Sequence, residues 1–374
     1  MFGSLSYLTL QEYWWFLVSL LGALFVFMTF VQGGQTILNR VAKTDEERDV
    51  IINSLGRKWE LTFTTLVMFG GALFAAFPLF YAVSFSGAYF VWMAILFCFI
   101  IQAVSYEYRK KPDNFLGQKT YEAFLYINGS IGIILIGIAV GTLFTGGHFV
   151  RSDMNFSHWT TAFRGLEGAL NPFNVALGFM VFFLARVQAS LYFLNNIEHD
   201  EIEKRTKAQL KNDALLFVGF FLLFVVFLLN LSGVGYDNSH FFVVKHKFLL
   251  NLIANPILLV LFLVGTLMVL YAIFVSLSKG SKKGIWFSGV GTILVVLTLF
   301  CLLGFNNTAI YPSLSDLQSS LSIVNSSGSY YTLTVMSYVS LLVPIVLGYI
   351  IFVWRSMDKE KITADEIRSD SHGY

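Results

Sequence analysis

The chain has 374 residues, of which 56% are apolar, 17% are aromatic and only 13% are charged, and its formal net charge is +2. Soluble domains carry about 25% charged residues, and the mean hydropathy here is +0.68. These values exclude a water-soluble globule and a disordered chain. Because the net charge is so small, we also expect no nucleic-acid partner.

Long charge-free stretches divide the chain into segments of membrane length. A helix needs about 20 mainly apolar residues to cross the bilayer. The stretch between Glu60 and Glu107 is long enough for two helices, joined by a turn at 84–87. We therefore predict an all-α polytopic membrane protein with nine transmembrane helices, forming a single domain over 1–357 with a short cytoplasmic tail over 358–374. The predicted helices cover 13–36, 61–83, 88–106, 123–144, 171–194, 214–235, 248–277, 285–305 and 331–354.

The distribution of Lys and Arg supports this count. With nine helices, the segments that share a side with the C-terminus hold 20 of the 25 Lys and Arg residues, and the other segments hold 4. Cytoplasmic loops are enriched in Lys and Arg, so we predict a periplasmic N-terminus and a cytoplasmic C-terminus. Residues 1–11 contain neither Lys nor Arg and therefore lack the basic start of a cleaved signal peptide.

Three features of the predicted helices concern packing. Trp14, Trp15 and Trp354 lie near helix ends, where we expect indole rings to face the membrane interface. A run of small residues at 70–76 predicts a close helix contact. Pro78, Pro256 and Pro344 predict kinks, or less commonly a broken-helix transport site. The segment 306–329, rich in Ser and Asn, predicts a polar outer cap.

Few residues offer chemistry at membrane depth. Trp59 and Glu60 open the second predicted helix, where Glu60 either loads protons from the cytoplasm or is a helix-terminal acid favoured by the helix dipole. Glu107, which ends the third predicted helix, is either a second proton-path acid or half of an interfacial charge pair with the basic residues after it. Arg186 lies about 12 Å inside the fifth predicted helix. It either extends to the interface, pairs with Glu60 or with an acid of a partner, or approaches an anionic group such as a propionate.

Cofactor signals are sparse. Cys98 and Cys301 lie in apolar segments and read as core residues. All six histidines fall in predicted loops or in the tail, whereas an intramembrane haem needs an axial ligand from a helix. The sequence has no phosphate-binding loop and no metal-ligand motif. We therefore expect any haem to belong to a partner chain.

Several motifs resemble one known family. The runs GGALFAAFPLFYA at 70–82 and FSGAY at 85–89 are similar to subunit II of the cytochrome bd-type quinol oxidases. Shorter similarities recur in order along nearly the whole chain, at 45–48, 51–55, 106–110, 171–173, 255–258 and 332–336.

This resemblance implies a subunit of a terminal oxidase in the bacterial cytoplasmic membrane. The complex would oxidise quinol, reduce O2 to water and generate a proton-motive force. A haem-bearing subunit I would hold two haems b and one haem d, and this chain would complete a heterodimer surrounded by membrane lipids. A small single-span subunit, and a structural quinone or lipid, are further expectations. The proton-path acids of the family correspond to Glu60, after Trp59, and to Glu107.

Two positions depart from the family pattern. The acid near the end of the first helix is replaced by Gln32, and the polar segment after Glu60 is replaced by Leu61-Thr62-Phe63. Both changes alter the buried polar lining, so we expect proton routing to differ. Two alternatives remain open from the residues: a secondary transporter with Glu60 and Arg186 in a central site, and a scaffold that only stabilises its partner.

Overall fold

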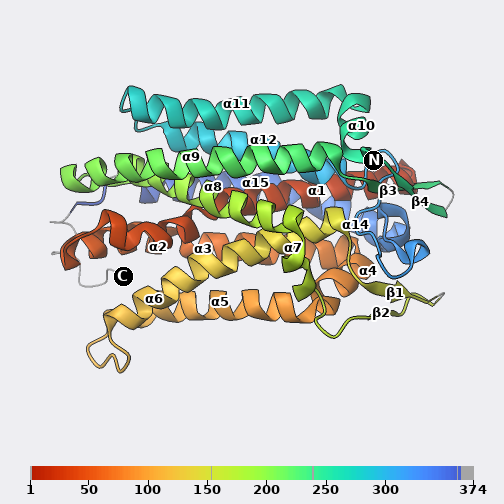
Figure 1. Ribbon diagram of the computed structural model, residues 1–374, viewed down its shortest axis with the longest axis horizontal. Helices are drawn as coiled ribbons and strands as arrows, with labels where there is room; N and C mark the ends of the chain where they lie inside the picture. The colour runs from red at the N-terminus through yellow and green to blue at the C-terminus, as the bar shows by residue number, and fades with distance from the viewer. Residues whose placement is uncertain (1, 153, 238–239, 360, 364–374) are drawn as a thin grey trace.

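The computed structural model describes residues 2–152, 154–237, 240–359 and 361–363 (Figure 1). Within this part of the chain, nine helical spans are long and apolar enough to cross a membrane, which confirms the predicted number. The spans run side by side along the long axis of the molecule. They cover Tyr7–Val41, Asp45–Ala76, Tyr89–Tyr108, Gln118–Thr145, Pro172–Asn196, Asp200–Asn230, Pro256–Ser278, Gly284–Leu302 and Tyr330–Met357.

Several spans contain more than one helix. The α-helices are α1 (Tyr7–Met28), α2 (Phe30–Val41), α3 (Asp45–Ala76), α4 (Pro78–Tyr81), α5 (Tyr89–Tyr108), α6 (Gln118–Ile127), α7 (Ile133–Thr145), α8 (Pro172–Asn196), α9 (Asp200–Asn230), α10 (Lys247–Ala254), α11 (Pro256–Ser278), α12 (Gly284–Leu302), α13 (Ile323–Ser326), α14 (Tyr330–Val339) and α15 (Val343–Met357). Two hairpins pair β1 (Phe149–Arg151) with β2 (Ser157–Trp159) and β3 (Gly233–Asp237) with β4 (His240–Val244). Two π-helical turns, 82–87 and 128–132, interrupt the helical path.

Prolines break the helices where the sequence predicts kinks. Helix α3 ends just before Pro78, and α11 starts at Pro256 after a break at Asn255. Pro344 lies in the first turn of α15, where a missing backbone N–H costs least. Helices α3 and α9 start earlier than predicted, at Asp45 and Asp200, because their first turns lie among charged residues and charge-free stretches mark only the membrane part.

The closest helix approaches lie away from the predicted small-residue run. A Cβ on Gly33 would lie 2.1 Å from the carbonyl oxygen of Ala185, so α2 and α8 pack backbone to backbone. At Gly71, in contrast, a Cβ would meet nothing within 4 Å. The prediction of a close contact at 70–76 is therefore wrong for Gly71 within the described chain, because this helix face is exposed.

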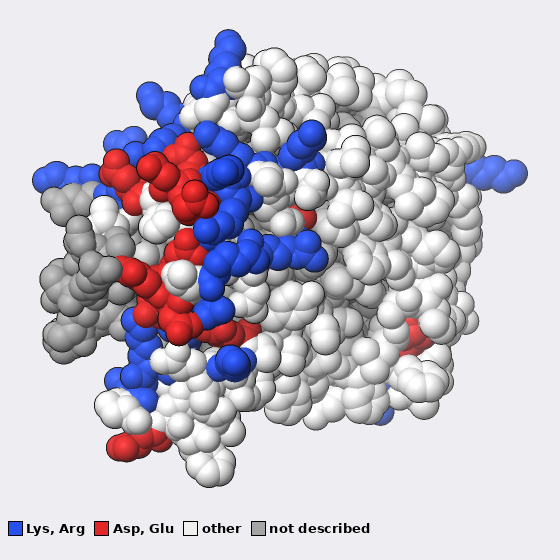
Figure 2. Space-filling view, turned by 60° about the vertical axis from the view of Figure 1, so that its left-hand side comes forward, with Lys and Arg blue, Asp and Glu red and all other residues white. Residues whose placement is uncertain are grey.

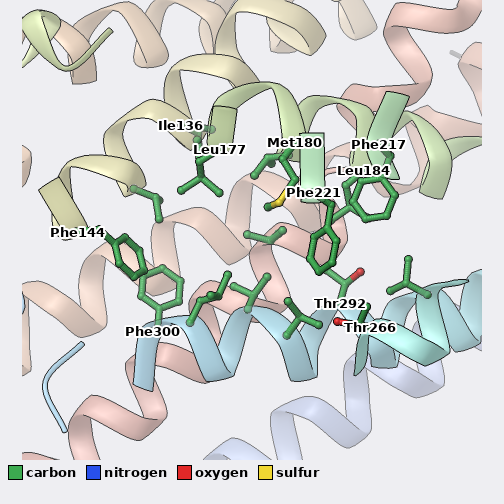
Figure 3. A pocket seen from close by; sticks show the side chains of 18 of the residues that line it. Ile136, Phe144, Leu177, Met180, Leu184, Phe217, Phe221, Thr266, Thr292 and Phe300 are labelled. Atoms are coloured by element: carbon green, nitrogen blue, oxygen red, sulfur yellow. The ribbon is translucent and has the colours of Figure 1, made fainter. Parts of the chain in front are cut away.

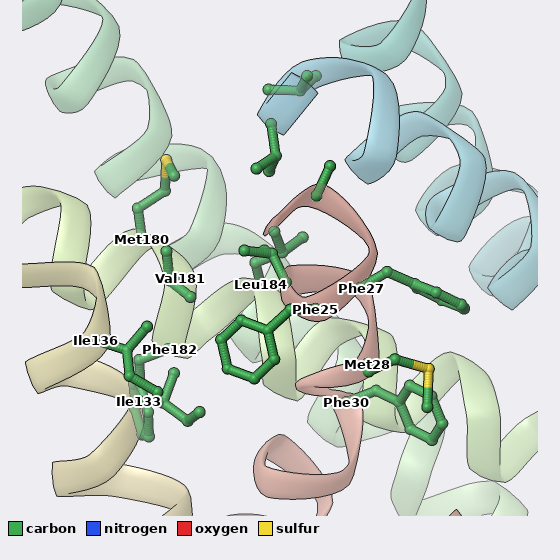
Figure 4. Packing of buried hydrophobic residues seen from close by; sticks show 14 of the residues in the cluster. Phe25, Phe27, Met28, Phe30, Ile133, Ile136, Met180, Val181, Phe182 and Leu184 are labelled. Atoms are coloured by element: carbon green, nitrogen blue, oxygen red, sulfur yellow. The ribbon is translucent and has the colours of Figure 1, made fainter. Parts of the chain in front are cut away.

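The core is one large cluster of aromatic and aliphatic side chains, with a second, small cluster at Val234, Phe241 and Ala309. Figure 4 shows Phe25, Phe182 and Ile136 converging from α1, α8 and α7. Cys98 and Cys301 are buried and free, as predicted for core residues. Trp14, Trp15 and Trp354 lie near helix ends, as predicted, but their rings are buried against neighbouring helices and not exposed at the surface. The indole N–H of Trp15 donates to the carbonyl oxygen of Leu303 at 2.7 Å.

The two ends of the bundle differ. Figure 2 shows Lys, Arg, Asp and Glu gathered at one end of the visible face, with few on the remaining surface. The two hairpins and the segment 303–329 lie at the opposite end (Figure 1). There Tyr311 stacks on Phe149 at 5.2 Å, and burial raises the pKa of Tyr311 far above its ordinary value. We call the charged end the basic end.

The chain after α15 returns to the bundle. The N–H of Ile362 donates to the carbonyl oxygen of Asn196, and the carbonyl oxygen of Ile362 accepts from the N–H of Glu198. The described residues of the predicted tail therefore contact the end of α8, while 364–374 lie outside the described residues. The domain limits stay a prediction.

Candidate functional site

Two predicted site regions meet at the basic end. The indole of Trp59 on α3 stacks on the phenol of Tyr106 on α5, with ring centroids 5.6 Å apart and planes 10° from parallel. Both rings are buried, and each is followed in sequence by an exposed glutamate, Glu60 and Glu107. The stack therefore brings the two proton-path candidates onto neighbouring helices beside one buried aromatic pair.

Neither glutamate has a protein partner among the described residues. Arg109, which the charge-pair interpretation of Glu107 requires, instead binds Glu122 at 2.8 Å and Asp49 at 2.7 Å. Lys110 binds Asp49 as well. The charge-pair interpretation is therefore wrong for Arg109 and Lys110, because acids on α3 and α6 lie closer to these two cations.

A chain of buried amides lies behind the stack. The side chain of Gln35 donates to the Tyr106 hydroxyl at 3.1 Å and to Gln102 Oε1 at 2.8 Å. Gln32 donates to the same Gln102 oxygen at 2.8 Å. All three glutamines are buried. Gln32, predicted to replace a family acid, is thus part of a neutral network of three glutamines, which we call the amide cluster.

The amide cluster has unused hydrogen-bonding capacity. Gln32 Oε1, Gln35 Oε1 and Gln102 Nε2 have no hydrogen-bond partner in the part of the chain that the structure describes. The same holds for Trp59 Nε1 and for both polar side-chain atoms of Asn128, which lies in a π-helical turn that packs against α2 and α5. Each buried polar atom without a partner costs about 1–3 kcal/mol, and such sites are where internal water is found.

The sequence did not point to Gln35, Gln102 or Asn128. The signal that could have found them is their position inside predicted membrane spans, where polar side chains are costly unless they are used. Glutamine carries no charge, however, so the positions of charged residues within the predicted spans do not reveal it.

Arg186 forms an ion pair that was not anticipated. Its Nε and Nη2 donate to Asp213 Oδ1 on α9 at 3.0 and 2.9 Å, and Gln209 donates to Asp213 Oδ2 at 2.9 Å. The guanidinium also lies over the ring of Phe182. The proposed pairing of Arg186 with Glu60 is therefore wrong, because α8 and α9 are packed neighbours and place Asp213 at the level of Arg186.

A second buried ion pair fixes the end of α15. Lys58 is fully buried, and its Nζ lies 2.8 Å from Asp358 Oδ1. Asn196 also donates to that oxygen at 3.1 Å, and Ser54 donates to Asn196 at 2.6 Å. The pair joins α3, α8 and the segment after α15.

The apolar cavity between α8 and α12 is too small for a prosthetic group. Figure 3 shows an apolar cavity of about 60 Å³ whose lining side chains, among them Met180, Phe221 and Phe300, point toward one another. Small-molecule sites usually measure about 300–1,000 Å³. Within the described residues no histidine lies inside a membrane span, and no three His, Cys, Asp or Glu side chains gather as metal ligands. These residues do not fit a haem.

Comparisons with known proteins agree with one another. Residues 10–357 match the family model described as cytochrome bd terminal oxidase subunit II. The chain is 28% identical to cytochrome bd-I ubiquinol oxidase subunit 2 of Escherichia coli strain K12, over 98% of this chain and 99% of that one. It is 26% identical to cytochrome bd ubiquinol oxidase subunit 2 of Bacillus subtilis, over 95% and 99% of the two chains. Its fold is similar to a chain of bd oxidase from Geobacillus thermodenitrificans, with a TM-score of 0.65 at 16% identity, covering 94% of this chain and 100% of that one.

Proposed function

Because the chain belongs to the cytochrome bd terminal oxidase subunit II family and is thus a subunit of an oxidoreductase complex, we propose that it takes up protons from the cytoplasm for a haem-bearing subunit I. The complex oxidises quinol and reduces O2 to water in the bacterial cytoplasmic membrane. Subunit I would hold the haems, two of b type and one of d type, and these would supply oxygen binding and electron transfer.

The positive-inside rule supports the direction of uptake. The basic end holds most of the Lys and Arg residues, as expected for cytoplasmic loops. Glu60 and Glu107 both lie toward this end, so their carboxylates can exchange protons with the cytoplasm. The N-terminus is then periplasmic, and 358–374 is cytoplasmic.

The observation that carries the proposal is the Trp59–Tyr106 stack, with exposed acids on one side and the amide cluster on the other. Glu60 holds the proton at its carboxylate. Tyr106, Gln35, Gln102 and Gln32 form a continuous hydrogen-bonded chain, and their unused donors and acceptors can orient water along it. Gln32 cannot itself carry a proton as a carboxylate would, so water must perform each transfer in this segment.

Substitutions of Glu60 test the proposal. Glu60→Gln is expected to lower quinol-dependent oxygen uptake per haem in the purified complex, and Glu60→Asp to restore part of it. Glu107→Gln tests the second acid in the same way. Glu12→Gln makes the same change on an exposed acid at the opposite end and is the matched control. Unchanged turnover in Glu60→Gln, at equal haem content, would contradict proton uptake through Glu60 and leave the chain as a scaffold.

A further inference from the structure

A second cavity lies between the last helix and the rest of the bundle. It measures about 650 Å³, within the range of small-molecule sites. Helices α1, α3, α12 and α15 form its walls, which are almost entirely apolar. Its apolar lining includes Leu24, Met28, Met68, Ile293, Leu347 and Ile351.

The cavity occupies one half of the membrane. Along α15 its lining runs from Leu347 to Arg355, eight residues or about 12 Å. Along α12 it runs from Ile293 toward Trp286 in the first turn of that helix. Because the hydrocarbon core is about 30 Å thick, the cavity reaches from the basic end to near the bilayer centre. It opens to the surface, since Ile351 is 54% exposed.

The end of the cavity nearest the charged loops presents hydrogen-bond donors. Trp354 lines the cavity and is only 7% exposed, and its buried Nε1 has no hydrogen-bond acceptor within the described protein. The next residue, Arg355, also lines the cavity and forms no ion pair with a described residue. The half-exposed ring of Trp286 lies 5.9 Å from that of Trp354.

The charges around these donors do not cancel Arg355. Asp358, one turn further along the chain, is bound by Lys58 and by Asn196. Lys58 also lies over the Trp354 ring, at 5.2 Å from its centroid. Among the described residues, Arg355 therefore has no counter-ion, and it follows a residue whose buried N–H has no acceptor.

We propose that this cavity binds one anionic phospholipid from the leaflet at the basic end. One acyl chain fills the apolar walls, and phosphate oxygens accept hydrogen bonds from Trp354 Nε1 and from the Arg355 guanidinium. Arg and Trp at the interface suit a phosphate headgroup, and anionic lipids attract basic groups at this surface. A neutral isoprenoid, or an apolar helix of another subunit, would fill the walls but offer Arg355 no counter-ion beyond the described residues, which provide none.

This inference goes beyond the proposed function, which assigns no lipid to any residue. The test uses the complex purified in mild detergent from native membranes. Bound phosphatidylglycerol, cardiolipin and quinone are extracted and quantified per complex by mass spectrometry. Because the readout is lipid content, its result does not depend on whether Glu60 carries protons.

Three variants probe the site. Arg355→Gln removes the cation, Trp354→Phe removes the N–H but keeps a ring, and Ile293→Trp fills the cavity. Arg355→Gln and Trp354→Phe are each expected to retain anionic phospholipid about tenfold more weakly than the wild type, as for the loss of one charge-assisted hydrogen bond. Ile293→Trp is expected to weaken retention at least as much, because its ring takes the place of the acyl chain. Lys359→Gln removes a cation near the same surface without touching the cavity and is expected to keep the wild-type lipid content.

Stability gives a second readout. Phosphatidylglycerol added to the delipidated complex is expected to raise the unfolding temperature of the wild type more than that of Ile293→Trp. Equal lipid content in the wild type, Arg355→Gln and Ile293→Trp would overturn the proposal. So would loss of quinone instead of phospholipid, or loss of another subunit with the phospholipid unchanged.

Discussion

Trp59 and Tyr106 stack nearly parallel, 10° apart, although they lie on different helices. Each ring directly precedes a glutamate. The contact between the two rings therefore fixes the positions of two exposed carboxylates on the surface of the bundle. The Tyr106 hydroxyl also accepts from Gln35, so the same residue marks the inner boundary of the stack. The stack thus separates a charged surface from a neutral hydrogen-bonded interior.

Gln102 is the centre of the amide cluster, because its oxygen accepts from both Gln32 and Gln35. Gln102→Leu would leave two buried N–H groups without this acceptor. We expect the free energy of unfolding to fall by about 1–3 kcal/mol, measured as a lower unfolding temperature of the purified complex. Gln118→Leu, the same change at an exposed position, should have little effect. A fall of equal size in both variants would contradict a special role for the cluster.

Gly33 and Gly71 form a matched pair for helix packing. Gly33→Ala places a methyl group 2.1 Å from the Ala185 carbonyl, so α2 and α8 must separate, and assembly of the complex should fall several-fold. Gly71→Ala meets no atom within 4 Å and should be neutral or stabilise the chain by about 0.5–1 kcal/mol, the usual difference between Gly and Ala in a helix. The yield of assembled complex after detergent extraction measures both. If Gly71→Ala alone prevents assembly, that exposed face contacts another subunit.

The pair of Arg186 and Asp213 is expected to be structural. Arg186→Leu leaves the Asp213 carboxylate buried with Gln209 as its remaining partner, so stability should fall by about 3–5 kcal/mol. Arg186→Lys should restore part of it, since one ammonium cannot reproduce the two N–H contacts of the guanidinium. Turnover per haem in the complex that does assemble should stay unchanged. A selective loss of turnover at full stability would contradict this assignment.

Lys58 and Asp358 can be tested as a thermodynamic cycle. Lys58→Met and Asp358→Asn each leave a buried partner uncompensated and should cost about 3–5 kcal/mol. The double variant should be more stable than the sum of the single effects predicts, because it removes both charges. Unfolding of the purified complex measures the three variants, with Lys111→Met as an exposed control. Strict additivity would show that the two charges do not interact.

The helical architecture could be predicted from the sequence more completely than the contacts between side chains could. Charges are excluded from the hydrocarbon, so the nine spans follow from the charge-free stretches. The breaks at Pro78 and Pro256 follow from proline, which lacks a backbone N–H. The partner of Arg186 could not be found this way. Asp213 ends a run of charged residues and was counted with the loop, whereas the helix continues through that run.

The site was predicted in part. Trp59, Glu60 and Glu107 lie around one stacked pair, as the motifs suggested, but the interior behind them consists of glutamines whose hydrogen bonds depend on tertiary packing. The burial of Trp14 and Trp15 was missed for a related reason. A tryptophan near a helix end is exposed at the membrane interface only where no neighbouring helix covers it. Here α14 covers Trp14 and α12 covers Trp15.

The bond between Lys58 and Asp358 also sets an order of events during synthesis. The two residues are 300 positions apart, and at about 5–20 residues per second the ribosome needs about 15–60 s to advance from one to the other. During that interval the spans up to the eighth are synthesised while the counter-charge of Lys58 has not yet been translated. Lys58 must therefore stay hydrated or bound to lipid phosphate until Asp358 has been synthesised, so this bond closes the bundle only after the spans that precede Asp358 have been made.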